Sequence, residues 1–136
     1  MRYLWLVILG VAAIAATGCG PSASELGRAI YRDGVGLEGR LAYTQGPDWL
    51  RFAGSGCAVC HGDQGQGLTV QAGAVVGAAP AITWTALVAR GYDEATLRHA
   101  LVAGVDPYGR EFHYYMPRWT MSTAEMDALL AYLRSL

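Results

Sequence analysis

Apolar residues repeat at helical spacing near both ends of the chain. Leu26 and Ile30 lie four residues apart, on one face of a helix that we predict over residues 24–32. Ser22 and Glu25 have the spacing of a capping box at the start of this helix. The pattern therefore places an amphipathic helix soon after the N-terminal segment.

The C-terminal helix has the clearest pattern in the chain. Ser122 and Glu125 again have the spacing of a capping box. The apolar positions after this cap follow helical spacing: Met126, Leu129, Leu130, Leu133 and Leu136. Met121 precedes the cap, so we assign it to a hydrophobic staple with Met126.

Two shorter helices are predicted between these ends, over residues 83–90 and 93–103. Leu97 and Leu101 mark the buried face of the second one, and Gly104 is placed to end it. The chain thus reads as a mostly helical protein.

Glycine-rich segments without helical periodicity separate these helices. Residues 62–77 are predicted to be irregular, and residues 33–56 form a long connection in which residues 40–44 have the composition of a short strand. Tyr43 and Trp49 argue against disorder in the longer segment, because disordered segments contain few aromatic residues. We therefore interpret residues 33–56 as a structural flap rather than a binding loop.

The N-terminus has the features of a bacterial export signal. Residues 3–16 are apolar and uncharged but too few to span a bilayer comfortably. The segment from Ala16 to Cys19 resembles the lipobox of bacterial lipoproteins, although leucine is usual where Ala16 stands. We expect a signal peptide over residues 1–18 and a tether over residues 19–23. An uncleaved membrane anchor and an ordinary signal peptide are the alternatives.

Composition limits the remaining possibilities. Residues 24–136 are enough for one small domain. The net charge of the chain is −1 and no basic cluster stands out, so nucleic acid is not an expected partner.

The most specific motif is Cys-Ala-Val-Cys-His at residues 57–61, because Cys-x-x-Cys-His is the attachment site of a c-type haem. Cys57 and Cys60 lie three residues apart and face the same way on one helical turn, so each thiol can bind one vinyl group of a single porphyrin. His61 follows directly and is placed to bind the iron.

Two other uses of this motif are less consistent with the sequence. A zinc knuckle needs a second pair of Cys or His at short spacing, which the chain lacks. A thioredoxin-like redox pair is expected in a βαβ setting, whereas the flanks here are glycine-rich. Of the three cysteines, two are assigned to haem; lipidation of Cys19 explains the third.

The second iron ligand must come from a Met or His elsewhere in the chain. The candidates are Met116, Met121, Met126, His99 and His113. We favour Met116, because Pro117 pushes it out of the helical region and lets a loop thioether project toward an iron. His113 is the main rival, since His99 is expected to face away from the core.

The chain resembles class I c-type cytochromes over residues 24–136. The resemblance rests on Cys57-x-x-Cys60-His61-Gly62, on Met116-Pro117-Arg118-Trp119 and on the closing residues 131–136. It implies an all-α cytochrome c fold, with three to five short helices around one covalently bound haem. Residues 33–56 are longer than in minimal members of the family, and we expect them to cover one haem edge.

The resemblance also suggests roles for individual residues. Gly27 and Tyr31 match the positions at which the first helix meets an aromatic residue of the last, here Tyr132. Pro80 is placed to orient His61 through its carbonyl group. Trp84 and Trp119 are candidates to line the haem pocket or to bind a propionate, with plain core packing as the alternative.

The implied function is single-electron transfer on a haem with His61 and Met116 as axial ligands, and no enzymatic activity of its own. We expect redox proteins as partners, an extracytoplasmic location, and attachment to the membrane through a lipid on Cys19. Two alternatives are a haem-bearing subunit of a larger membrane oxidoreductase complex, and a haem enzyme or gas sensor with an open sixth iron position.

Overall fold

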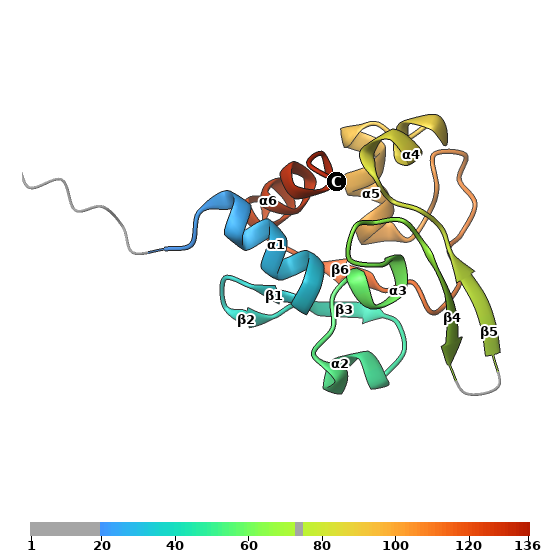
Figure 1. Ribbon diagram of the computed structural model, residues 1–136, viewed down its shortest axis with the longest axis horizontal. Coiled ribbons are helices and arrows are strands. Elements are labelled where there is room, and N and C mark those ends of the chain that lie inside the picture. Colours follow the sequence, from blue (N-terminus) through green and yellow to red (C-terminus); the bar gives the residue numbers. More distant parts are fainter. Residues whose placement is uncertain (1–19, 73–74) are drawn as a thin grey trace, which may run out of the picture.

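The computed structural model describes residues 20–72 and 75–136 (Figure 1). The expected signal peptide over residues 1–18 and the expected lipidation at Cys19 lie outside the described residues. Within those described ranges, no helix combines the length and the apolar character that crossing a membrane requires.

Helices dominate the described structure, which confirms the predicted all-α class, although the six helices exceed the three to five expected. They are α1 (Ala23–Asp33), α2 (Trp49–Ala53), α3 (Ala58–His61), α4 (Trp84–Ala89), α5 (Glu94–Ala103) and α6 (Thr123–Leu133).

Short strands pair into three small antiparallel ladders between the helices. These pairs are β1 (Val35–Gly36) with β2 (Gly39–Arg40), β3 (Ala42–Gln45) with β6 (Arg118–Thr120), and β4 (Leu68–Ala72) with β5 (Val75–Ala79).

Helix α1 begins at the predicted capping box. The backbone N–H of Glu25 donates to Ser22 Oγ at 3.3 Å, and the Glu25 carboxylate accepts from the Ser22 backbone N–H at 2.8 Å. Leu26 and Ile30 are buried, as their spacing predicted. Gly34 ends the helix in the left-handed conformation, with φ of 65°.

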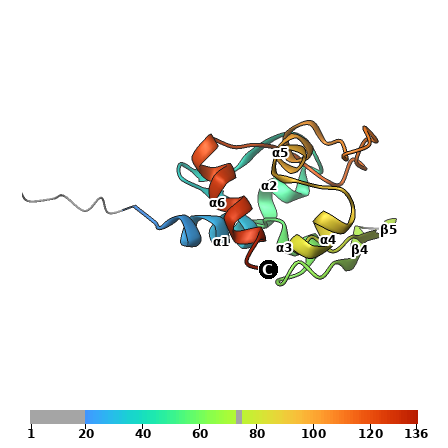
Figure 2. The same cartoon turned by 90° about the horizontal axis from the view of Figure 1, so that it is seen from above.

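The core lies where α1 crosses α6, as Figure 2 shows from above. Gly27 meets the backbone of Ala128 at this crossing, so the helices touch where α1 has no side chain. The rings of Tyr31 and Tyr132 pack at 5.2 Å between centroids. The predicted contact between the first and last helices is confirmed.

The two middle helices also form as predicted. Thr83 caps α4, and its hydroxyl accepts from the Ala86 backbone at 3.3 Å. Leu97 and Leu101 of α5 are buried, whereas His99 is exposed.

Residues 33–56 fold onto the body of the protein. The expected strand over residues 40–44 is present as β3, which pairs with β6 so that Tyr43 lies opposite Trp119. The Tyr43 hydroxyl donates to the carbonyl of Pro47 at 2.7 Å. The sequence pattern missed α2, which has only five residues and no side-chain cap.

The irregular conformation predicted for residues 62–77 is confirmed for residues 62–67 but is wrong after them, because β4 and β5 form a hairpin there (Figure 1). Thr69 and Val70 in one strand and Val75 and Val76 in the other are β-branched, and such residues favour strands. The glycines around them obscured this preference in the sequence.

Replacing Gly27 with alanine should destabilise the protein, although alanine is the better helix former by about 1 kcal/mol. The new methyl group would overlap the Ala128 carbonyl, and we expect a net loss of about 1–3 kcal/mol, as in other overpacked cores. Unfolding in guanidinium chloride measures this loss. Gly77→Ala is the matched control, because nothing lies within 4 Å of the added Cβ. A Gly27→Ala variant as stable as the wild type would contradict the close helix contact.

Candidate haem site

The Cys-x-x-Cys-His motif forms one helical turn beside the end of α1. The backbone N–H of His61 donates to the Cys57 carbonyl at 2.9 Å. Cys57 and Cys60 are not joined by a disulfide, and both are partly buried. Tyr31 of α1 donates its hydroxyl to the carbonyl of Gly62 at 2.6 Å. Helix α1 therefore fixes the backbone directly after His61, a contact that the sequence did not reveal.

His61 has the state that an iron ligand requires. It is only 6% exposed, and its Nδ1 lies 2.8 Å from the carbonyl oxygen of Pro80. Because a carbonyl can only accept, Nδ1 carries the proton and Nε2 keeps its lone pair. Burial lowers the pKa of His61, which keeps the ring neutral. The predicted hydrogen bond between Pro80 and His61 is present.

The β4–β5 hairpin explains how Pro80 reaches His61. The backbone N–H of Gly67, just before β4, donates to the His61 carbonyl at 2.8 Å. Gly67 has φ of 81°, and a Cβ there would collide with the backbone of residues 79–81. Only glycine lets the two ends of the hairpin touch, which brings Pro80 back beside the motif.

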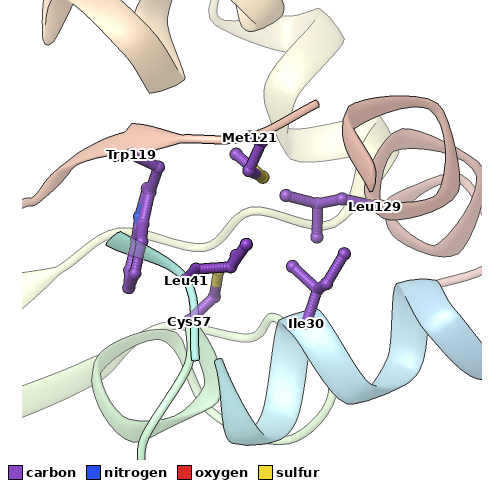
Figure 3. Close-up of a pocket in the computed structure, with 6 residues that line it drawn as sticks. All are labelled: Ile30, Leu41, Cys57, Trp119, Met121 and Leu129. Atoms are coloured by element: carbon purple, nitrogen blue, oxygen red, sulfur yellow. The ribbon is translucent and has the colours of Figure 1, made fainter. Parts of the chain in front are cut away.

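An apolar cavity lies beside Cys57 (Figure 3). Its side chains come from α1, from α6 and from the chain around β3 and β6: Ile30, Leu41, Cys57, Trp119, Met121 and Leu129. Its empty space of about 170 Å³ is smaller than the roughly 300–1,000 Å³ of ligand pockets, so it marks apolar side chains beside Cys57 and does not hold a whole haem.

Trp119 offers a specific test of whether a haem fits here. Its Nε1 is buried and has no hydrogen-bond partner in the described part of the chain. An unpaired buried donor costs about 1–3 kcal/mol, and a haem propionate would supply an acceptor. Trp84 is placed differently: it lies under the guanidinium group of Arg134, 4.8 Å from the ring centre, and does not line this cavity. That position fits core packing for Trp84.

The thiol chemistry argues against the two other uses of the motif. Burial raises the pKa of Cys57 to about 12 and also raises the pKa of Cys60. Redox-active cysteine pairs instead have lowered thiol pKa values. Over residues 20–72 and 75–136, no three His, Cys, Asp or Glu side chains cluster as a metal site would need. The donor set of two thiols and one neutral imidazole fits a covalently held haem.

The candidates for the second ligand occupy different environments. Met116 is partly buried in a bend directly before β6. His113 is exposed, and its ring stacks on Tyr115 at 5.3 Å between centroids. Met121, assigned from the sequence to a helix staple, lines the cavity beside Cys57 (Figure 3). Met121, which the sequence named as a candidate but assigned to the staple, is thus a rival of Met116 in the structure.

The sequence also gave no sign of the role of Arg118. This arginine is buried, and its guanidinium group donates to backbone carbonyls of the loop that contains Met116. An isolated arginine between Pro117 and Trp119 reads as a surface residue, because arginine is rarely buried.

Comparison with known proteins agrees with this geometry. The family model described as cytochrome c matches residues 50–136, which include the haem motif, Met116 and the last helix. Neither the curated proteins nor the solved structures that were searched gave a match. The family match covers well over half of the chain. The chain therefore belongs to the cytochrome c family, and its cofactor is a haem held covalently at Cys57 and Cys60.

Proposed function

We propose that this protein is a membrane-tethered carrier of single electrons, with one haem whose iron is bound by His61 and Met116. Membership of the cytochrome c family already gives a haem-binding electron-transfer protein. The observation that carries the finer proposal is the state of His61, which is buried, neutral and oriented by Pro80. The sequence has a single Cys-x-x-Cys-His motif, which supports one haem.

The residues of the site have distinct tasks in this proposal. When bound, the haem supplies an iron that gains or loses one electron. The Pro80 carbonyl holds the imidazole of His61 in one tautomer and one orientation, so that Nε2 stays directed at the metal. Trp119 donates its buried N–H to a propionate and so removes a costly unpaired group.

Three features favour Met116 over its rivals. Its loop is tied down by hydrogen bonds to Arg118, so its side chain starts from a fixed backbone. The ring of His113 is exposed and stacks on the ring of Tyr115. Met121 directly precedes the cap of α6 and lines the same cavity as Ile30 and Leu129. This position suits packing against the part of the haem that is attached to Cys57. With His61 and Met116 both bound to the iron, no position would be left on it for a substrate or a gas.

The membrane tether is the second part of the proposal. The segment from Ala16 to Cys19 supports lipidation of Cys19. Helix α1 begins at Ala23, so a lipid at Cys19 would hold the domain close to the membrane surface. This places the protein outside the cytoplasm, beside redox partners in or near the same membrane.

The covalent haem link is tested by substituting the two cysteines. Acid acetone should leave the haem on the wild-type chain, because thioether bonds survive denaturation. The Cys57→Ala/Cys60→Ala double variant should yield protein from which haem is extracted or absent. Absorption of the washed precipitate measures this. Normal haem retention in the double variant would refute covalent attachment at these residues.

Substitution of Met116 tests the ligand and the function together. The wild type should show a sulfur-to-iron band at the red end of the ferric spectrum and bind little carbon monoxide. Met116→Ala should lose the band and bind carbon monoxide in the ferrous state. Met116→His should stay low-spin with a lower potential, since axial ligands move haem potentials over a range of about 0.8 V.

Met121→Ala and His113→Ala are the matched controls for Met116. Both should keep the sulfur-to-iron band. Met121→Ala should lose only stability, by less than the about 2–5 kcal/mol of a fully buried methionine, because Met121 is only partly buried. Loss of the band in Met121→Ala alone would make Met121 the ligand. Strong carbon monoxide binding by the wild type would replace electron transfer with a sensor or enzyme function.

Cys19→Ser tests the tether. The wild type should fractionate with membranes and carry acyl chains on its first mature residue, because two or more chains give stable anchoring. The variant should lack the lipid mass and lose lipoprotein processing. Mass spectrometry of the N-terminal peptide distinguishes these states. An unmodified Cys19 in the wild type would exclude the lipoprotein.

A further inference from the structure

Arg118 is a buried cation that is paired with backbone oxygens rather than with a carboxylate. Its side chain is only 6% exposed. Among the ion pairs found in the described ranges, none involves Arg118. A buried charge is costly unless hydrogen bonds replace its water. The partners of this guanidinium group therefore indicate what its burial achieves.

The guanidinium group joins the two ends of one short loop. Its Nη2 donates to the carbonyl of Phe112 at 2.8 Å, and its Nη1 donates to the carbonyls of His113, at 3.2 Å, and Met116. The Met116 N–H closes the same turn by donating to the His113 carbonyl at 2.9 Å. We call this set of hydrogen bonds, from Arg118 to Phe112, His113 and Met116, the clamp. Each of its residues lies within five positions of Met116.

The rest of the fold leaves room for this clamp. Gly104 ends α5 with φ of 73°, and a Cβ on it would collide with the Arg118 side chain. The Gly104 carbonyl also accepts from the backbone N–H of Phe112 at 2.7 Å. The end of α5 is thus shaped around the guanidinium group and holds the start of the loop.

Strand β6 fixes the base of the clamp. Arg118 and Trp119 pair with Gln45 and Tyr43 of β3. Because successive side chains of a strand point to opposite faces, Trp119 can line the cavity beside Cys57 while Arg118 extends away under the loop. One rigid strand therefore connects the cavity to the position of Met116.

We propose that Arg118 is a positioning residue that keeps the Met116 thioether on the haem iron. This inference rests on the proposed ligation by Met116. Any shift of this loop that carries Met116 away from the iron breaks charge-assisted hydrogen bonds inside a buried site. At high pH hydroxide competes with Met116 for the iron, and the sequence contains no lysine that could compete as well. The pH at which Met116 is replaced therefore depends on how firmly its loop is held.

The experiment follows the sulfur-to-iron band of the ferric protein as the pH is raised. Arg118→Met keeps a long side chain but removes every donor. We expect its band to disappear at a pH lower by about one unit or more, a tenfold change in the ligand equilibrium. Its ferrous form should bind carbon monoxide at least about tenfold more tightly, for the same reason. Arg118→Gln, which keeps two amide N–H donors and adds no competing amine but lacks the charge and the planar fork, should restore part of the difference.

Arg98→Met is the matched control, since Arg98 pairs only with the surface carboxylates of Glu94 and Asp127. It should leave the pH midpoint and carbon monoxide binding unchanged. A folded Arg118→Met variant with the midpoint of the wild type would overturn the proposal. If that variant does not fold, Arg118→Gln decides, and a midpoint equal to that of the wild type would overturn the proposal. Absence of the band in the wild type would instead refute ligation by Met116.

Discussion

The close contact of α1 with α6 at Gly27 is the constraint on which the other parts of the structure depend. Because α1 lies against α6, Tyr31 is positioned to hold the backbone beside His61. Helix α6 in turn carries Glu125, which caps its own helix and accepts from the backbone N–H of Leu37 at 2.8 Å. The haem motif and the segment before it are therefore both attached to one pair of crossed helices.

The sequence predicted those parts of the fold that are encoded locally. Capping boxes and apolar spacing gave α1 and α6, and the motif gave the position of the haem. The β4–β5 hairpin is also local, but the glycines around it obscured its β-branched residues in the sequence. Helix α2 was missed because the docking of a five-residue helix depends on distant partners. For the same reason the sequence assigned Met121 to a staple with Met126, although it also lines the cavity beside Cys57.

Residues 33–56 are a structural part of the domain rather than an addition to it. Strand β3 pairs with β6, which follows Met116 directly, and Tyr43 packs edge-on against Trp119 at 5.6 Å between centroids. A change in this segment would therefore shift Met116 and Trp119 through β6. The prediction that it covers a haem edge is consistent with this position, since Trp119 lines the cavity beside Cys57.

The burial of Cys57 limits when the protein can acquire its cofactor. In the folded domain, burial raises the pKa of this thiol to about 12, so almost none of it is in the reactive thiolate form at neutral pH. The side chain is also covered by residues from both ends of the chain, Ile30 and Leu129. Thioether formation is therefore favoured on an open chain, before α6 docks on α1.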